Sequence, residues 1–398
     1  MKTCNRLLLA ALCLALLPAC DESDPTLGKG GKSGGKTTTS DTFVTDVKAP
    51  DIFVGSKGKD KTKYHTFRIP AIVMTTKGTL LAFCEGRKSS GGDSGDIDLV
   101  LRRSPDGTNW GPLITVWNDG LNTCGNPCPA VDPETGRIHL LMTWNLGTDK
   151  SAGDFNTGKT TDTRRPYYTY SDDDGKTWAK PVEITAQAKK EEWGWYATGP
   201  CHGIVLTKGV HKGRLLFPCD ANEIQSITGS TTGYSHVVYS DDQGKTWHIG
   251  GTVRGGNESC AAELEDGRII LTCRASGGKR MLAWSSDGGE TFTAGTSVAA
   301  LPDPRCQGCI LSTTFNGKDV LLHANCADAS DRIKMTVKGS TDGGQNWTSG
   351  YLVSSPHVAY SDMVILNNTI MLLFYENGES SSYEKISVQR IAISYVIK

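Results

Sequence analysis

Short apolar runs alternate with polar turns along most of the chain, at intervals of about ten residues. Many runs follow a Gly-Arg or similar turn, as in GTLLAF, GRIHLLMTW, GRLLFPC, GRIILTCR, KDVLLHANC and NTIMLLFYE. Runs of this length bounded by turn residues are typical of β-strands, and helical periodicity is nearly absent. The pattern therefore predicts an all-β fold, with residues 185–193 as a candidate for a short helix.

A turn motif recurs five times, beginning at Ser104, Ser171, Ser240, Ser285 and Ser340. Four copies fit Ser-x-Asp-x-Gly-x-x-aromatic, and the first copy is one residue shorter. In such a turn the Asp and Ser side chains bind backbone amides and glycine supplies a positive φ angle, so we expect these aspartates to be structural. Copies about 45 to 70 residues apart fit four-stranded blades arranged radially. The repeat thus predicts a β-propeller with these Asp-boxes as hairpin turns.

The composition excludes two classes of partner. The chain has 398 residues, 21% of them charged, and a net charge of −1 with both signs interspersed. No basic stripe is present to attract nucleic acid or a membrane surface, so we expect neither as a partner. The length fits one repetitive domain or two ordinary ones.

The first 20 residues have the features of an export signal. Lys2 and Arg6 precede an apolar run over residues 7–17, and Cys20 follows shortly after. The run is shorter than the roughly 20 residues that cross a bilayer, as in a secretory signal peptide. The segment resembles the lipobox of bacterial lipoproteins, which implies cleavage before Cys20 and a lipid attached to it. A plain signal peptide with a chance cysteine is the alternative.

Residues 21–42 are rich in Gly, Lys, Ser and Thr and have almost nothing to bury, which predicts a flexible tether. The folded domain is then expected to span residues 43–398. We expect an exported monomer that meets a membrane only through a lipid anchor.

Ten cysteines follow Cys20, and an exported protein permits disulfides. Close spacing gives four candidate pairs: Cys124 with Cys128, Cys201 with Cys219, Cys260 with Cys273, and Cys306 with Cys309. Spacing alone does not assign connectivity. The CQGC segment has no second such pair in the chain, so we expect no metal and no other cofactor.

One charged residue lies inside an otherwise apolar strand-like stretch. The segment KYHTFRIPAIV contains Arg68 between an aromatic residue and an Ile-Pro step. A buried guanidinium is costly unless an anion meets it. Arg68 is therefore either bound to an internal carboxylate or positioned for a ligand that carries one.

FRIP near the start, the Asp-boxes and the segments quoted below occur in the order found in sialidases (neuraminidases) of glycoside hydrolase family 33. The chain resembles this family from about Asp51 to near its end. The resemblance implies a six-bladed β-propeller with the site at the centre of one face. It also implies a retaining exo-α-sialidase that acts on sialylated glycans.

Three arginines are implied to bind the carboxylate of the substrate: Arg68, Arg274 in GRIILTCRA, and Arg332 in DASDRIKMTV. Sialic acid carries a carboxylate on its anomeric carbon, and planar guanidinium forks bind that group better than lysines. An ordinary salt bridge is the alternative for each arginine alone.

Tyr360 in VAYSDMVIL matches the nucleophile of the family, and Glu258 in GGNESCAAEL matches the base that takes its proton. A neutral phenol can approach a substrate whose own carboxylate would repel an Asp or Glu nucleophile. A half-buried structural tyrosine is the alternative. Glu263 is a competitor for Glu258, but it falls later on a strand where a solvated carboxylate is expected.

The acid is implied to lie in EGRKSSGGDSGDIDLVL, which contains three aspartates. Asp93, in a Gly and Ser loop, resembles the loop aspartate of the family, with Asp96 as the second choice. Asp98 alternates with apolar residues in a strand and is expected to make a structural contact. Arg87 also matches a site position, with a structural ion pair as its alternative.

The remaining matches are supporting residues. Glu376 in LLFYENG matches the carboxylate that holds Arg68, and Asn126 in CGNPCPAVD matches a residue of the rim or acyl pocket. Three aromatic residues are either site or packing residues: Trp193, Trp195 and Tyr196.

Two other functions remain open. An intramolecular trans-sialidase would use the same residues with different loops around the aglycone. A non-catalytic propeller would only bind glycans, and the Tyr360 and Glu258 pair argues against it because a binder has no use for that pair.

Overall fold

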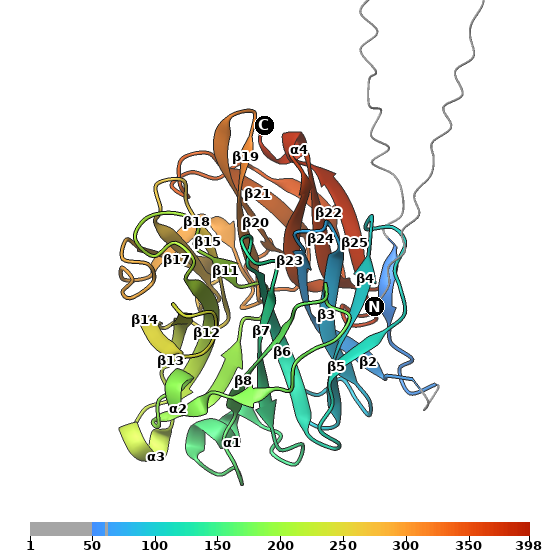
Figure 1. Ribbon diagram of the computed structural model, residues 1–398, viewed down its shortest axis with the longest axis vertical. Coiled ribbons are helices and arrows are strands. Elements are labelled where there is room, and N and C mark those ends of the chain that lie inside the picture. Colours follow the sequence, from blue (N-terminus) through green and yellow to red (C-terminus); the bar gives the residue numbers. More distant parts are fainter. Residues whose placement is uncertain (1–49, 60–62) are drawn as a thin grey trace, which may run out of the picture. The chain divides into compact units, whose positions relative to one another are not determined.

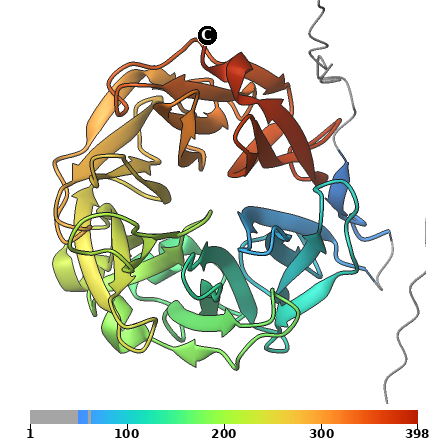
Figure 2. The same ribbon diagram turned by 45° about the horizontal axis from the view of Figure 1, so that its top comes forward.

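The computed structural model describes residues 50–59 and 63–398, which form an all-β propeller. The strands form five hydrogen-bonded sheets, and these sheets are arranged in a ring (Figure 2). The predicted all-β propeller is confirmed. The proposed signal peptide and tether, together with Cys20, lie outside the described residues.

The strands follow one another around the ring in chain order (Figure 1). An eight-stranded sheet contains β2 (Thr66–Met74), β3 (Leu80–Arg87), β4 (Ile97–Ser104), β5 (Ile114–Trp117), β6 (Thr123–Val131), β7 (Ile138–Asn145), β8 (Arg165–Ser171) and β9 (Val182–Glu183). A five-stranded sheet contains β10 (Trp193–Thr198), β11 (Ile204–Val205), β12 (Leu215–Glu223), β13 (Gly233–Ser240) and β14 (His248–Arg254). Two four-stranded sheets comprise β15 (Ser259–Glu263), β16 (Ile269–Cys273), β17 (Lys279–Ser285) and β18 (Thr296–Pro302), then β19 (Cys309–Phe315), β20 (Lys318–Cys326), β21 (Met335–Ser340) and β22 (Tyr351–Ser354).

The two ends of the described chain meet in the last sheet. It has the order β1 (Asp51–Val54), β25 (Lys385–Ala392), β24 (Ile370–Asn377) and β23 (Val358–Asn367). Strand β1 pairs antiparallel with β25, so residues near the start of the described chain complete a sheet formed by its end. This pairing closes the ring.

Helices are short and lie in connections: α1 (Ala152–Thr157), α2 (Thr185–Ala188), α3 (Gln225–Thr228) and α4 (Ile393–Val396). Helix α2 falls within the predicted segment 185–193. Helix α1 begins at a cap in which the Ser151 side chain accepts hydrogen bonds from the amides of Gly153 and Asp154. No helix in the described part of the chain is long and apolar enough to span a bilayer.

The Asp-boxes are hairpin turns stabilised by their own side chains. In the copy at Ser240, the hydroxyl donates to Asp242 and accepts from the amide of Gly244, at 2.9 Å each. Asp242 also accepts from the amide of Thr246 at 2.8 Å, and Gly244 has a φ angle of 82°. Corresponding bonds are present in the copies at Ser171, Ser285 and Ser340. The structural role predicted for these aspartates is confirmed.

None of the four candidate cysteine pairs forms a disulfide. All ten cysteines of the described residues are free and buried. In three of the pairs the two thiols belong to different apolar clusters: Cys124 and Cys128, Cys201 and Cys219, Cys260 and Cys273. In the fourth pair, Cys309 contacts Ser361 with 3.8 Å between Sγ and Oγ. The thiols are therefore buried without forming disulfides, which spacing in the sequence does not reveal.

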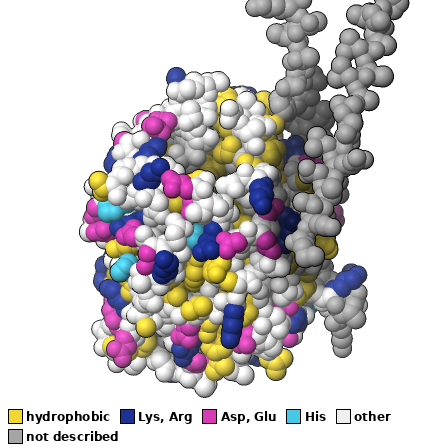
Figure 3. Space-filling model, viewed as in Figure 1, with side chains coloured by type: hydrophobic (Ala, Val, Ile, Leu, Met, Phe, Trp, Pro, Cys, Tyr) yellow, Lys and Arg dark blue, Asp and Glu magenta, His cyan; other side chains and the backbone are white. Residues whose placement is uncertain are grey.

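The surface carries charges of both signs. On the face shown in Figure 3, Lys and Arg side chains are interspersed with Asp and Glu. This distribution agrees with the net charge of −1.

Candidate active site

The residues matched to the family lie at the ends of strands from different sheets. Asp93 is in the loop between β3 and β4, Glu258 directly precedes β15, Arg274 directly follows β16, and Tyr360 lies in β23. All four line one cavity of about 600 Å³. Because β15 and β16 are antiparallel neighbours, the residue before one and the residue after the other lie at the same end of the sheet.

Tyr360 and Glu258 are in direct contact. The Tyr360 hydroxyl donates to Glu258 Oε1 at 2.5 Å. Arg274 Nη1 donates to Glu258 Oε2 at 2.6 Å and lies 3.1 Å from the Tyr360 oxygen. The tyrosine proton therefore points at a carboxylate that is itself held in place by a guanidinium.

Tyr360 is a buried phenol in a strongly charged environment. Burial and the negative charge of Glu258 raise the pKa of Tyr360 well above its usual range, and the nearby arginines offset only part of this rise. The group is therefore neutral in the free protein. A neutral phenol with a carboxylate in hydrogen-bond contact can act as a nucleophile if the carboxylate accepts its proton during the attack.

Arg68 is oriented by an internal carboxylate. Its Nε donates to Glu376 Oε1 at 2.7 Å, and the same oxygen accepts from the amide of Ile69 at 2.9 Å. The other oxygen of Glu376 accepts from the amide of Tyr360 at 3.2 Å. Glu376 is completely buried, so it fixes both the guanidinium and the backbone of the tyrosine. Among the described residues, the Nη groups of Arg68 donate no hydrogen bond, and Nη1 approaches Asp93 at 4.0 Å. They therefore remain available to a ligand.

Arg332 lies beside the other two arginines without a carboxylate of its own. Its Nη1 donates to the hydroxyl of Tyr383 at 2.8 Å, and no carboxylate among the described residues is within ion-pair distance. The guanidinium carbons of Arg68 and Arg332 lie 4.9 and 5.4 Å from the centroid of the Tyr360 ring. Three guanidinium groups, including that of Arg274, therefore surround one phenol and can bind an anion together.

Asp93 projects from its loop toward two arginines. Its Oδ1 lies 2.9 Å from Arg87 Nη1, and its side chain is 65% exposed. Partial burial raises the pKa of Asp93, but the charges of Arg87 and Arg68 outweigh it, so the pKa lies below its usual range. Asp93 is therefore ionised in the free protein and needs a proton before it can act as an acid.

The other two aspartates of this segment are engaged elsewhere. Asp96 forms an ion pair with Lys88 at 2.8 Å and lines a different pocket. Asp98 accepts hydrogen bonds from the hydroxyl of Tyr64, at 2.5 Å, and from the side chain of Asn118. Asp93 alone of the three lines the cavity with Tyr360.

Beside the cavity, Asn126 belongs to a buried network with two residues that were not predicted. Glu85 accepts from the amide of Asn126 at 2.9 Å and from Nε and Nη2 of Arg87 at 2.9 and 2.7 Å. Arg164 donates from Nη2 to Asn126 Oδ1 at 2.7 Å, and its guanidinium carbon lies 3.9 Å from the Trp195 ring centroid. Burial lowers the pKa of Arg164 to about 10, because nearby carboxylates offset only part of the desolvation.

The three aromatic candidates of this region have different environments. Trp193 and Tyr196 are buried in an apolar cluster, whereas Trp195 lines the cavity. Asp220, which was also not predicted, is fully buried and accepts from Asn257 Nδ2 at 3.1 Å. Burial and the charge of Glu258 raise the pKa of Asp220 well above its usual range. A neutral Asp220 can thus hold the residue that precedes Glu258.

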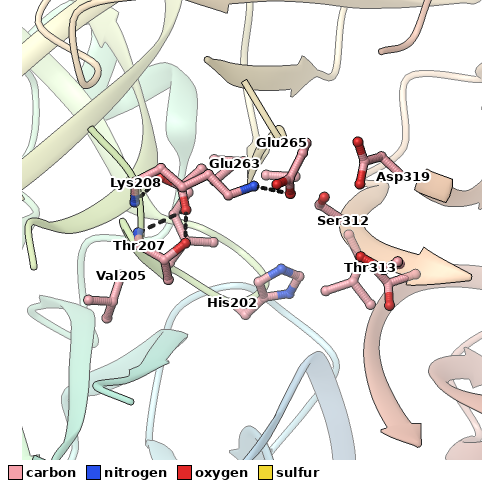
Figure 4. A pocket seen from close by; sticks show the side chains of 14 residues that line it. His202, Val205, Thr207, Lys208, Glu263, Glu265, Ser312, Thr313 and Asp319 are labelled. Atoms are coloured by element: carbon pink, nitrogen blue, oxygen red, sulfur yellow. Dashed lines mark hydrogen bonds and ion pairs between the residues drawn. The ribbon is translucent and has the colours of Figure 1, made fainter. Parts of the chain in front are cut away.

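Glu263, the competitor for Glu258, lies in a separate pocket (Figure 4). Its carboxylate accepts from the amide and hydroxyl of Thr207, at 2.8 and 2.6 Å, and from the amide of Lys208 at 3.1 Å. Glu258 and Glu263 stand at opposite ends of β15, which separates Glu263 from Tyr360 by the length of that strand.

Comparisons with known proteins find sialidases among the relatives of this chain. The model of the BNR repeat-like domain family matches residues 78–373. An exo-alpha-sialidase of Aspergillus fumigatus is 35% identical over 297 residues, covering 70% of this chain and 68% of the relative. A sialidase of Bacteroides fragilis is 31% identical over 355 residues, covering 83% of this chain and 63% of the relative.

Solved structures with the same architecture include a sialidase and an intramolecular trans-sialidase. A Hadza microbial sialidase superposes with a TM-score of 0.76 at 28% identity, covering 84% of this chain and 67% of that one. A leech intramolecular trans-sialidase superposes with a TM-score of 0.71, covering 88% of this chain and 71% of that one. At 18% identity, the latter likeness shows the fold alone. The family model matches most of this chain, and the chain covers 68% of an exo-alpha-sialidase at 35% identity. This chain therefore belongs to the BNR repeat-like domain family and to the sialidases.

Proposed function

We propose that the chain is a retaining exo-α-sialidase, which releases terminal sialic acid from glycans. The 2.5 Å contact between the Tyr360 hydroxyl and Glu258, inside a cluster of three arginines, is the observation that carries this proposal. The sialidase relatives support the activity. A protein that only binds glycans would need the arginines but not a phenol paired with a base.

The arginines and the tyrosine have complementary tasks. Arg68, Arg274 and Arg332 bind the carboxylate on the anomeric carbon, which brings that carbon next to Tyr360. The Tyr360 oxygen attacks the anomeric carbon while its proton passes to Glu258. The bond to the aglycone oxygen breaks, and that oxygen takes a proton from Asp93.

The second step reverses these roles. Asp93 removes a proton from a water molecule, whose oxygen attacks the anomeric carbon. The bond to Tyr360 breaks, and the phenol regains its proton from Glu258. Two displacements at one carbon give net retention of configuration.

Product analysis tests this function. The protein is incubated with 3′- and 6′-sialyllactose, and the first product formed is identified by time-resolved NMR. We expect free sialic acid as its α anomer before mutarotation. A β anomer would contradict the double displacement, a 2,7-anhydro product would identify an intramolecular trans-sialidase, and binding without turnover would identify a glycan-binding propeller.

Asp93 gives a pH-linked prediction. A carboxylate bound to Arg68 removes much of the positive field that lowers the pKa of Asp93, so that this pKa should rise when ligand binds. At about pH 5, a 2,3-unsaturated sialic acid analogue should therefore bind with uptake of a proton, mostly by Asp93. Calorimetric titrations in two buffers of different ionisation enthalpy measure this uptake. Asp93→Asn should remove most of this uptake, and undiminished uptake in that variant would contradict the assignment.

We also propose that the propeller has six blades. The eight-stranded sheet then counts as two, β2 to β5 and β6 to β9. The support is that a single parallel residue pair, Ile97 with Thr123, joins the two halves, whereas neighbouring strands within each half are antiparallel.

For localisation we propose an exported lipoprotein anchored at Cys20, on the basis of the sequence of residues 1–20. Cys20→Ala should move the protein from the membrane fraction to the soluble fraction and leave its specific activity intact. Cell fractionation with an activity assay measures both. Unchanged fractionation would contradict the anchor.

A further inference from the structure

Arg305 is a charged residue of the cavity that the steps above do not use. It lines the same cavity as Glu258, Arg274 and Tyr360, and its side chain is exposed. In the part of the chain that the structure describes, Arg305 makes no ion pair. An arginine with a free guanidinium at a substrate cavity can bind an anionic group of the substrate.

The loop that carries Arg305 is held firmly. Asp303, which is completely buried, accepts from Arg280 Nη1 and from the amide of Cys306, both at 3.0 Å. The amide of Asp303 in turn donates to the carbonyl of Gly278 at 3.1 Å, in the loop that follows Arg274. Arg305 itself has a φ angle of 58°, which a residue other than glycine rarely adopts. Its backbone is therefore fixed at the rim.

Arg305 lies on the side of the cavity where the aglycone leaves. This assignment rests on the proposed function. The carbonyl of Arg305 lies 3.5 Å from Nη2 of Arg332, one of the three arginines that bind the carboxylate. In a sialoside, the carboxylate and the glycosidic oxygen are attached to the same carbon. The aglycone therefore leaves the cavity beside the carboxylate site, whereas the acyl and glycerol groups lie across the sugar ring from it.

The rest of the cavity lining suits a sugar. Neutral hydrogen-bonding side chains such as Asn222, Thr231 and Ser276 also line it and suit sugar hydroxyls. We infer that Arg305 forms an anion subsite for the aglycone. The favoured substrates are sialosides whose penultimate sugar carries a carboxylate, as in sialic acid linked to sialic acid, or a sulfate. Both anions present paired oxygens to a guanidinium fork.

Three substrates test this inference: 3′-sialyllactose, α2,8-disialyllactose, and 3′-sialyllactose with a sulfate on the galactose. For each enzyme form, kcat/KM for an anionic aglycone is divided by kcat/KM for the neutral one. Arg305→Gln should lower this ratio about fivefold, the effect of losing one solvent-exposed ion pair, and Arg305→Lys should restore part of it. Added salt should lower the ratio in the wild type but not in Arg305→Gln.

Arg268→Gln is the matched control, because Arg268 is an exposed arginine at the opposite end of β16 from Arg274. It should leave the ratio unchanged. If Arg305→Gln lowers the ratio for the disialyl substrate alone, the anion that Arg305 binds is a carboxylate. If it lowers the ratio for the sulfated substrate alone, that anion is a sulfate. Cleavage with an unchanged ratio in Arg305→Gln overturns this inference alone. Failure of the wild type to cleave any of the three overturns the proposed function and this inference with it.

Discussion

Tyr360→Phe should lower kcat on sialyllactose by about a thousandfold or more, because it removes the nucleophilic oxygen and nothing else. The loss should leave binding of a 2,3-unsaturated sialic acid analogue nearly intact, since the arginines that bind the carboxylate do not depend on the hydroxyl for their charge. Steady-state kinetics and calorimetric binding measure the two effects separately.

Tyr375→Phe is the matched control for this change. Tyr375 lies in the neighbouring strand β24, and Tyr375 and Tyr360 are each 6% exposed. Loss of its hydroxyl should leave kcat within about twofold of the wild type, as expected away from the reacting atoms. Turnover of Tyr360→Phe near the wild-type rate, or a comparable loss in Tyr375→Phe, would contradict the nucleophile.

Arg274→Lys should lower kcat/KM by about tenfold to a hundredfold, the effect of losing a charged hydrogen bond to the substrate carboxylate. The lysine keeps the charge but loses the planar fork. A second effect is expected on kcat, because Arg274 also donates to Glu258 at 2.6 Å and contacts the Tyr360 oxygen. Both a higher KM and a lower kcat are therefore expected.

Arg268→Lys provides the comparison, since Arg268 and Arg274 flank the two ends of β16. Arg268 forms an exposed ion pair with Asp266, and Arg268→Lys should change neither KM nor kcat. If Arg274→Lys bound the unsaturated analogue as tightly as the wild type, Arg274 would be a structural residue.

The fold was largely predictable because its signals are local. Each Asp-box stabilises its turn through bonds within about five positions, as Ser240 and Asp242 do. The closure of the ring was not predictable from such signals, because it joins Asp51–Val54 to β25 at the far end of the chain. Helix α1 was missed since six residues are too few for a clear helical period.

The site residues that lie within recognisable sequence motifs could be predicted. Glu85 lies within the quoted EGRK segment, but its bond to the amide of Asn126 joins residues 41 positions apart. Arg164, Asp220 and Tyr383 lie outside the motifs, and their roles depend on partners distant in the sequence. Arg164, for example, meets Asn126 across 38 positions. The candidate cysteine pairs were wrong for a related reason: in three of the four, the two thiols are buried in separate apolar clusters, which spacing in the sequence does not show.

Covalent trapping tests the central claim, that Tyr360 forms a glycosyl intermediate while Glu258 takes its proton. A 2,3-difluorinated sialic acid has a good leaving group and a fluorine that slows breakdown of the intermediate by destabilising its oxocarbenium-like transition state. Wild-type protein is incubated with this compound, digested and mapped by mass spectrometry. The account predicts one sialyl label, on the Tyr360 peptide and absent from Tyr360→Phe. A label on a carboxylate such as Glu258 or Asp93 would contradict it.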